Sequence, residues 1–435
     1  MTRPVIHCVD NGDALNEPSP LEQPAEQFLL DLQRRAASVL GESEPRRSRA
    51  LTGPEVAHLL GAGAAELSPE DYQRHAALLA LLPAAVRAGD QPRPFEDPLD
   101  TEVWTRVLDH VLAVMRARAL PLPSRPVVGT LPTHAFEPLI VLAPGRAGVV
   151  LGLDPDTSVF LDLLGKAIAR LFLSASDGRL GFTPCDWALV LDSNHPAACA
   201  FTDMVLATLA GRSAWARPYL PGSAYEVFAS DLRDLMAMFL VGQACAHVSA
   251  GHVDRAPRAA FELPGSEIET PVFSLGEEFR ADLLAFDLLV AHVRAHERPV
   301  AVAGLAVESL LATLSILESA RALLGAGSQE RVVPPSAGCH VSRQHLVRCA
   351  VGMRDGVDGM AAEFVRSVQP AFDLLWVRVE QALLDPEVSA NVRRPGLYGR
   401  PWSQAASEYG EHAERVAKAT AIRHFVDEEL DDTGL

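Results

Sequence analysis

The chain has 435 residues, of which 48% are hydrophobic and 22% charged, so its composition is that of a globular protein with enough apolar material for a sizeable core. Its formal net charge of -18 argues against nucleic acid or an anionic membrane surface as a partner, because either would require clustered lysine and arginine. The six cysteines form no C-x-x-C pair, and residues 1–13 lack the apolar stretch of a secretory signal. We therefore expect a cytoplasmic protein with reduced thiols.

Two long apolar runs are candidates for crossing a membrane, which takes about 20 predominantly apolar residues. Residues 235–253 carry no formal charge but contain Gln243, His247 and His252. Residues 301–327 are interrupted by two glutamates and an arginine. Both runs are therefore predicted to be buried helices, and no transmembrane segment is expected.

The first part of the chain is predicted to be helical. Residues 1–18, rich in Asn, Asp, Glu and Pro, are expected to form a flexible lead-in. Residues 19–122 are predicted to form a helical N-terminal domain for interaction or support, with capping sequences at residues 52–55 and 68–71. A further helix is predicted to open near Asp100 and to bury four apolar side chains at helical spacing: Trp104, Val107, Leu108 and Leu112.

A Pro-rich break at residues 120–126 separates this domain from the remainder. Strand candidates follow at residues 139–142, 149–153 and 187–191, and a Gly-containing turn at 144–148 would join the first two in a hairpin. These strands would form only a small sheet. Two helices are predicted around them, at residues 158–173 and 196–210.

A long helix is predicted from Ser223, where Ser-Ala-Tyr-Glu makes a capping box. Gln243 and His247 are four residues apart, so they share one face of this helix. Gly251 is expected to cap its C-terminus. Residues 254–270, which contain prolines and a glycine, are expected to form an irregular loop that faces a substrate.

A second capping box at residues 274–277 opens the next predicted helix, on which Glu278 and Asp282 share one face. The predicted fold is mainly α (α+β), with a core at residues 127–352 and C-terminal helices with an acidic tail at 353–435. The remaining helices are predicted at residues 303–324, 343–352, 359–384 and 404–431.

Residues 239–252 and 277–285 together resemble the active-site helices of the gluzincin-type zinc metallopeptidases, in particular the soluble bacterial ones. In that family an apolar helix ends in H-E-x-x-H and a further G-H, and E-x-x-x-D follows on a later helix. His247 matches the second zinc histidine, Glu278 the third zinc ligand, and Asp282 the acidic residue that supports it. His252 matches the trailing histidine, and His340 loosely matches the histidine of a later S-x-H-P motif.

Two functional positions of the family pattern are replaced. Gln243 stands where the first zinc histidine is expected, and Ala244 stands where the catalytic glutamate is expected, so the motif reads Q-A-C-A-H. The resemblance covers roughly residues 139–349, and it implies a zincin-like fold for the core.

These replacements predict a loss of peptidase chemistry. A catalytic zinc needs three protein ligands and an open position, whereas only His247 and Glu278 would remain, because an amide is a poor zinc ligand. Ala244 cannot act as general base, and loss of a positioned base typically costs about 10²–10⁴-fold in rate. We therefore expect no catalytic residue and no cofactor. Gln243, His247, Glu278 and Asp282 would instead satisfy one another in a hydrogen-bonded network.

The main hypothesis is a catalytically inactive metallopeptidase-like protein that binds a protein or peptide, either where a substrate would lie or through the N-terminal domain. A structural helical protein without peptidase ancestry is a further alternative. The sequence does not define the partner or the oligomeric state. The enzymatic alternative is a zinc peptidase with a relocated ligand set, in which His247 and Glu278 are joined by His252, His340 or Cys339, with Glu277 as base.

Overall fold

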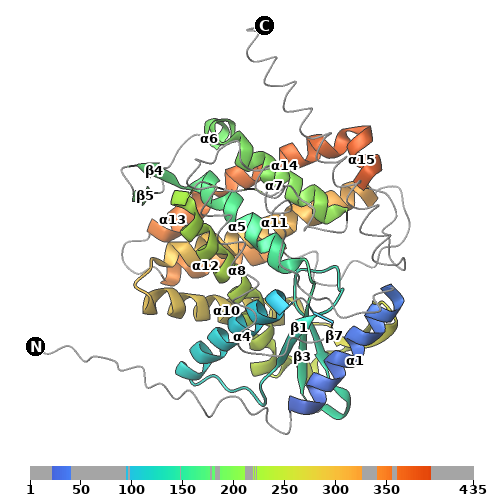
Figure 1. The fold of residues 1–435 in the computed structure, drawn as a ribbon. Coiled ribbons are helices and arrows are strands. Elements are labelled where there is room, and N and C mark those ends of the chain that lie inside the picture. Colours follow the sequence, from blue (N-terminus) through green and yellow to red (C-terminus); the bar gives the residue numbers. More distant parts are fainter. Residues whose placement is uncertain are drawn as a thin grey trace, which may run out of the picture.

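The structure is a computed structural model that describes residues 22–40, 95–96, 98–146, 148–176, 179–181, 187–210, 219, 221, 223–325, 340–354 and 360–392. These residues form a mainly helical protein with small β-sheets, which confirms the predicted fold class (Figure 1). Several predictions fall outside the described residues: the lead-in at 1–18, the helix starts at 52–55 and 68–71, and the helix and acidic tail within 404–435.

Helix α8 (Ser223–Ser249) lies at the centre of the molecule and has the predicted start. Four helices pack against it in one large hydrophobic core: α4 (Pro98–Ala117), α5 (Thr157–Phe172), α10 (Leu275–Ala295) and α11 (Val300–Gly325). The contact with α5 is close at Gly165, where an added Cβ would lie 2.6 Å from the carbonyl oxygen of Ala229. A larger residue at this position would push the two helices apart.

Helix α4 confirms the helix predicted near Asp100, and its four predicted core side chains, Trp104, Val107, Leu108 and Leu112, are all buried. These side chains belong to the same hydrophobic core as α8. The helix therefore packs directly on the part of the chain assigned to residues 127–352. The domain boundaries themselves stay a prediction.

A three-stranded sheet lies beside the helices, in the order β1 (Val127–Thr130), β3 (Val149–Leu153) and β2 (Leu139–Leu142). β1 is parallel to β3, and β2 and β3 form the predicted antiparallel hairpin. Neighbouring residues point to opposite faces. Val128 and Leu151 therefore face the main core, whereas Val127 and Val150 pack under helix α1 (Glu22–Leu40), as Figure 1 shows for the elements.

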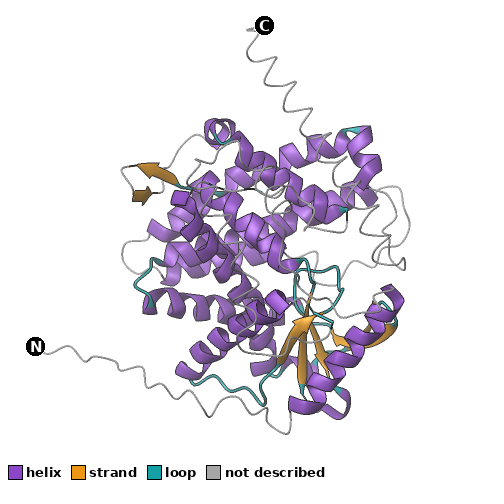
Figure 2. Cartoon of the chain, viewed as in Figure 1, coloured by secondary structure: helices purple, strands orange, loops and turns teal. Residues whose placement is uncertain are grey.

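Residues 258–271 form a second β-hairpin, so the prediction of an irregular loop at 254–270 is wrong (Figure 2). It follows the short helix α9 (His252–Arg255) and consists of strands β6 (Arg258–Leu263) and β7 (Ser266–Pro271). Gly265 lies in its turn with a φ of 72°, which glycine adopts without strain. The prolines that favoured a loop lie at the strand ends and the turn, where a missing N–H is tolerated.

Residues 187–191, predicted as a strand, belong to helix α6 (Trp187–Ser193). Periodicity alone cannot assign so short an apolar run. In the helix, Trp187 and Leu191 lie four positions apart and pack toward the core, while Leu189 is 68% exposed. Trp187 Nε1 also donates to the Ser367 carbonyl oxygen at 2.5 Å. Two short strands, β4 (Ser174–Ser176) and β5 (Arg179–Gly181), precede this helix and were not predicted.

The single helix predicted at 359–384 is two helices. The chain breaks at Val368, and Pro370 lies in the first turn of the second helix, where its missing N–H leaves no bond unmade. The helices predicted at 158–173, 196–210, 303–324 and 343–352 are confirmed with small shifts of their ends. The remaining α-helices are α7 (His195–Leu209), α12 (His340–Arg354), α13 (Met360–Ser367), α14 (Gln369–Leu384) and α15 (Pro386–Val392).

Helix α11 is long and apolar enough to cross a membrane by length and composition. However, 89% of its most apolar window is buried inside the protein. It contacts α8, α12 and α13. These contacts identify α11 as the core helix that the sequence predicted.

Candidate functional site

Helix α8 carries the first two predicted site residues on a buried face. Gln243 is 6% exposed and His247 is 1% exposed. The helix stops just before Gly251, whose left-handed φ of 65° turns the chain and brings His252 back beside His247. Ala244, which the sequence resemblance aligned with a catalytic glutamate, is fully buried in the hydrophobic core.

Helix α10 presents Glu278 and Asp282, and its start is fixed by the predicted capping box. The Glu277 backbone N–H donates to Ser274 Oγ, and the Ser274 backbone N–H donates to Glu277 Oε2 at 2.9 Å. The hydrogen bonds from the Ser274 backbone and hydroxyl lower the pKa of Glu277 because they stabilise its charged form. Glu277 is therefore held by the cap and is a poor proton acceptor.

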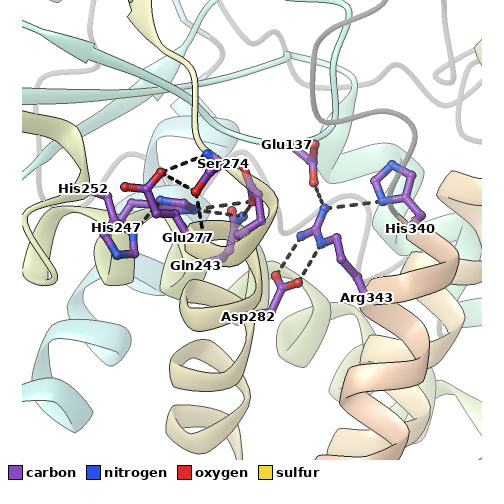
Figure 3. Close-up of polar contacts among 10 residues, drawn as sticks. Glu137, Gln243, His247, His252, Ser274, Glu277, Asp282, His340 and Arg343 are labelled. Atoms are coloured by element: carbon purple, nitrogen blue, oxygen red, sulfur yellow. Dashed lines mark hydrogen bonds and ion pairs between the residues drawn. The ribbon is translucent and has the colours of Figure 1, made fainter. Parts of the chain in front are cut away.

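Gln243, His247 and Glu278 meet in a compact polar group, which we call the amide triangle. Figure 3 labels Gln243 and His247 of this group. Gln243 Nε2 donates to Glu278 Oε2 at 2.8 Å and lies 3.4 Å from His247 Nε2. His247 Nε2 lies 3.5 Å from Glu278 Oε2. Ligand atoms that each lie about 2.0–2.1 Å from a tetrahedral zinc ion are separated by about 3.3 Å. The three atoms thus have nearly the spacing of a zinc tripod, but one of them is an amide nitrogen.

His252 contacts the other edge of the His247 ring. The two Nδ1 atoms lie 3.1 Å apart, whereas Glu278 faces His247 Nε2, so one imidazole donates to the other. Burial and the neighbouring His247 lower the pKa of His252, which keeps it neutral at pH 7. Phe273 stacks on His247 with ring centroids 3.7 Å apart. The structure therefore does not place His252 around one point with His247 Nε2 and Glu278.

Asp282 belongs to a second polar group, the guanidinium cluster, which consists of Asp282, Arg343, Glu137 and His340 (Figure 3). Arg343 on α12 donates from Nε and Nη2 to the two carboxylate oxygens of Asp282, at 2.7 and 2.8 Å. Its Nη1 bonds to Glu137, between β1 and β2, and lies 3.4 Å from His340 Nδ1. The side chains of Arg343 and Asp282 are 1% and 0% exposed, so this is a buried, bidentate ion pair.

Burial perturbs the proton affinities in and around this cluster. It lowers the pKa of His340 to about 4 and raises the pKa of Glu318 to about 7, and His340 Nε2 lies 3.3 Å from Glu318 Oε1. Burial also raises the pKa of Asp282, against the opposing charge and hydrogen bonds of Arg343. For Arg343, burial favours the neutral form, but the charges of Asp282 and Glu137 outweigh it and hold its pKa well above the usual value. Arg343 is thus a permanent cation among carboxylates.

The predicted site residues therefore fall into two groups and do not surround a single ion. His340 contacts Arg343 and Glu318, and Cys339 lies outside the described residues. Within the described ranges, no group of three His, Cys, Asp or Glu side chains is arranged to hold a metal ion. The amide triangle offers one imidazole, one carboxylate and one amide, which is a poor fit for a catalytic zinc.

Arg343, Glu137 and Phe273 were not predicted from the sequence. Arg343 had one local signal: it lies on the helix face that also carries Val347 and Val351, and a charged residue at such a position implies a buried partner. Glu137 is 206 residues away from Arg343, so no local pattern could pair them.

No protein-family model matches the chain, and searches of curated proteins and of solved structures found no match either.

Proposed function

We propose that this protein is a metallopeptidase-like protein that lacks peptidase activity and acts in the cytoplasm by binding a protein or peptide. The observation that carries the proposal is the 2.8 Å hydrogen bond from Gln243 Nε2 to Glu278 Oε2. This bond occupies the carboxylate that the family resemblance assigns to zinc. Its donor is a neutral amide, so the polar group is satisfied without an ion.

The absence of a general base supports the same conclusion. Ala244 has no proton acceptor, and its methyl group is packed in the apolar core. Glu277, the remaining candidate, is held in the cap of α10 with a lowered pKa. Loss of a positioned base costs about 10²–10⁴-fold in rate, which adds to the effect of a missing zinc ligand.

The partner is expected to bind over the amide triangle and not inside it. Gln243, His247 and Glu278 are at most 7% exposed, so a peptide side chain does not reach them. The β6–β7 hairpin is joined to this group at both of its ends in the sequence, because it lies between α9, which carries His252, and Phe273, which stacks on His247. Among the described strands, β6 pairs only with β7, so its outer edge can accept an extended peptide.

Zinc content and proteolysis of an unfolded casein substrate test the loss of catalysis. We expect no zinc that depends on His247 or Glu278 and no chelator-sensitive cleavage by the full chain. Stoichiometric zinc that disappears in both His247→Ala and Glu278→Ala, together with cleavage that these variants abolish, would support the relocated-ligand peptidase instead.

Hydrogen exchange tests the binding role. Addition of an unstructured peptide in excess should slow exchange of the backbone amides of residues 258–263, while the peptide stays intact. Unchanged exchange across a panel of such peptides would contradict binding at β6.

A further inference from the structure

The β6–β7 hairpin has one covered side and one open side. Strand β7 contacts β2 of the main sheet, and Thr270 Oγ1 on β7 donates to the Ile140 carbonyl oxygen at 3.1 Å. The far edge of the main sheet is covered as well, because the Thr130 N–H donates to Glu96 and the Thr130 carbonyl oxygen accepts from Gln33. Within the described residues, the outer edge of β6 has no such cover.

The pairing within the hairpin shows which backbone groups of β6 point outward. The Val272 N–H donates to the Pro257 carbonyl oxygen at 2.9 Å, and hydrogen-bonded pairs alternate with non-bonded pairs along an antiparallel ladder. Residues 259, 261 and 263 therefore bond to β7, whereas Arg258, Ala260 and Glu262 turn their N–H and C=O groups away from it. An extended peptide is the ligand that pairs with such a row of backbone groups.

The exposed face of the hairpin is acidic next to this edge. Directly opposed residues share a face, and the register places Glu262 opposite Glu267 and Ala260 opposite Glu269. All four side chains are exposed, whereas Ile268 on the other face is buried in the cluster that includes α1. No ion pair joins the three glutamates to another described residue. The like charges of Glu262 and Glu267 destabilise the hairpin, and a cation beside them would relieve this repulsion.

We infer that the peptide that binds along β6 is cationic, with lysine or arginine at alternate positions. The inference rests on the proposed function, which places a peptide at this strand, and it adds the charge and the register of that peptide. Alternate side chains of a paired strand lie on one face, so the basic side chains lie on the same face as Glu262. The short side chain of Ala260 lets a neighbouring lysine or arginine extend across β6 toward Glu269.

Two other roles of this edge give different results. A second copy of the chain could pair with β6, but two chains that each carry a net charge of -18 repel each other. Charged side chains on an edge strand can also prevent pairing with any other chain. An edge protected in this way rejects every peptide, whereas a cation-selective edge binds basic peptides and rejects acidic ones.

Binding of labelled peptides of equal length to the full chain tests the inference. Threonine alternates with lysine in the first peptide, with glutamine in the second and with glutamate in the third, and a fourth is the lysine peptide with N-methylated backbone amides. At 0.15 M salt, where charges are screened beyond about 8 Å, we expect the lysine peptide to bind at least about tenfold more tightly than the others. Hydrogen exchange should slow most at the amides of residues 258, 260 and 262, because β7 already protects those of 259, 261 and 263.

Matched variants separate the local charge of the hairpin from the charge of the whole chain. Glu262→Gln with Glu267→Gln should weaken binding of the lysine peptide by about fivefold or more, because both charges at the edge are lost. Glu297→Gln with Glu363→Gln removes the same net charge from exposed positions outside the hairpin and should weaken binding by less than about twofold. The first pair of substitutions also removes a repulsion, so that variant should be at least as stable as the wild type.

The possible failures of the inference and of the proposed function are distinguishable. Equal binding of the lysine and glutamine peptides, with slowed exchange at β6, would overturn the inference and leave the proposed function standing. Unchanged exchange at β6 with all the peptides would overturn both. Undiminished binding of the N-methylated peptide would show attraction by charge without strand pairing and would overturn the inference. Protection of these amides that grows with protein concentration, without peptide, would overturn it by identifying a second copy as the occupant.

Discussion

The amide triangle and the guanidinium cluster satisfy two carboxylates of the same helix by different means. Glu278 accepts from the neutral amide of Gln243, whereas Asp282, one turn further along α10, is held at both oxygens by Arg343. A buried carboxylate that has lost its cation is strongly destabilising, whereas a neutral donor can be exchanged at a smaller cost. Substitutions in the guanidinium cluster are therefore expected to destabilise the fold strongly, whereas a substitution in the amide triangle can change its chemistry at a smaller cost in stability.

The largest effect is expected from removing the cation. Arg343→Met leaves Asp282 buried without its partner and should lower the free energy of unfolding by about 3–5 kcal/mol. Denaturant unfolding measures the change. Arg354→Met is the matched control, because its bidentate partner Asp287 is partly exposed, and it should cost about 0.2–1 kcal/mol. Equal costs for the two variants would contradict the role of burial.

The second prediction is that one substitution turns the amide triangle into a zinc site. Gln243→His places an imidazole beside His247 Nε2 and Glu278 Oε2 and should create a zinc site. Zinc at 100 times its dissociation constant would then stabilise the fold by about 2.7 kcal/mol, measured by zinc-dependent unfolding. Addition of His247→Ala should abolish the gain, and a gain that survives it would rule out the triangle as the site.

A smaller loss is expected when the amide is deleted. Gln243→Ala leaves the buried Glu278 without its donor and should cost about 1–3 kcal/mol. Gln27→Ala removes an amide that donates to Asp31 at the surface and should change stability by no more than about 0.5 kcal/mol. The denaturation midpoints of the two variants measure the difference in stability. A Gln243→Ala variant as stable as the control would mean that water replaces the amide.

The smallest effect is expected from a change of pH. Two ionisable side chains that contact each other change the free energy of unfolding with pH in opposite directions, so their contributions partly cancel. Glu318 has its folded pKa raised from 4.5 to about 7, so its contribution to stability is present below about pH 4.5 and is lost as pH rises through 7. His340 has its folded pKa lowered from 6.5 to about 4, so its contribution is present above about pH 6.5 and is lost as pH falls through 4. Between about pH 4.5 and 6.5, the free energy of unfolding therefore falls with rising pH because of Glu318 and rises because of His340.

Single substitutions separate the pH dependence of stability that comes from Glu318 from that which comes from His340. In Glu318→Gln, stability should rise more steeply with pH between about 4.5 and 6.5 than in the wild type. In His340→Gln it should fall relative to the wild type over the same range. Unfolding free energies across this range measure both effects, and parallel curves for all three proteins would exclude the pair as a source of pH dependence.

Local sequence signals predicted the parts of the site that lie on one element. The i, i+4 spacing placed Gln243 and His247 together on α8, and the Ser274 capping box set the start of α10. The break at Gly251 was expected as well, and it explains how His252 reaches His247. These features depend on residues within one or two helical turns, which is the range over which a single sequence is informative.

The parts that were missed depend on distant partners. The strand β7 is tied to the main sheet by a hydrogen bond from Thr270 Oγ1 to the Ile140 carbonyl oxygen, 130 residues earlier. The guanidinium cluster joins α10, α12 and the segment before β2 through Arg343. Helix α6 was assigned wrongly because its apolar run is too short to show a period. In each of these cases, packing against residues that are distant in the sequence determines the structure.

The burial of Ala244 imposes an order on the mutational routes that lead from this protein to a metalloenzyme. A single nucleotide change converts a glutamine codon to a histidine codon, and the new ring would enter a group that is already polar. A glutamate at position 244 would instead place a carboxylate in an apolar core before any ion could compensate it, which is costly. Metal binding is thus one step away, whereas catalysis can only follow after the core beside α8 has opened.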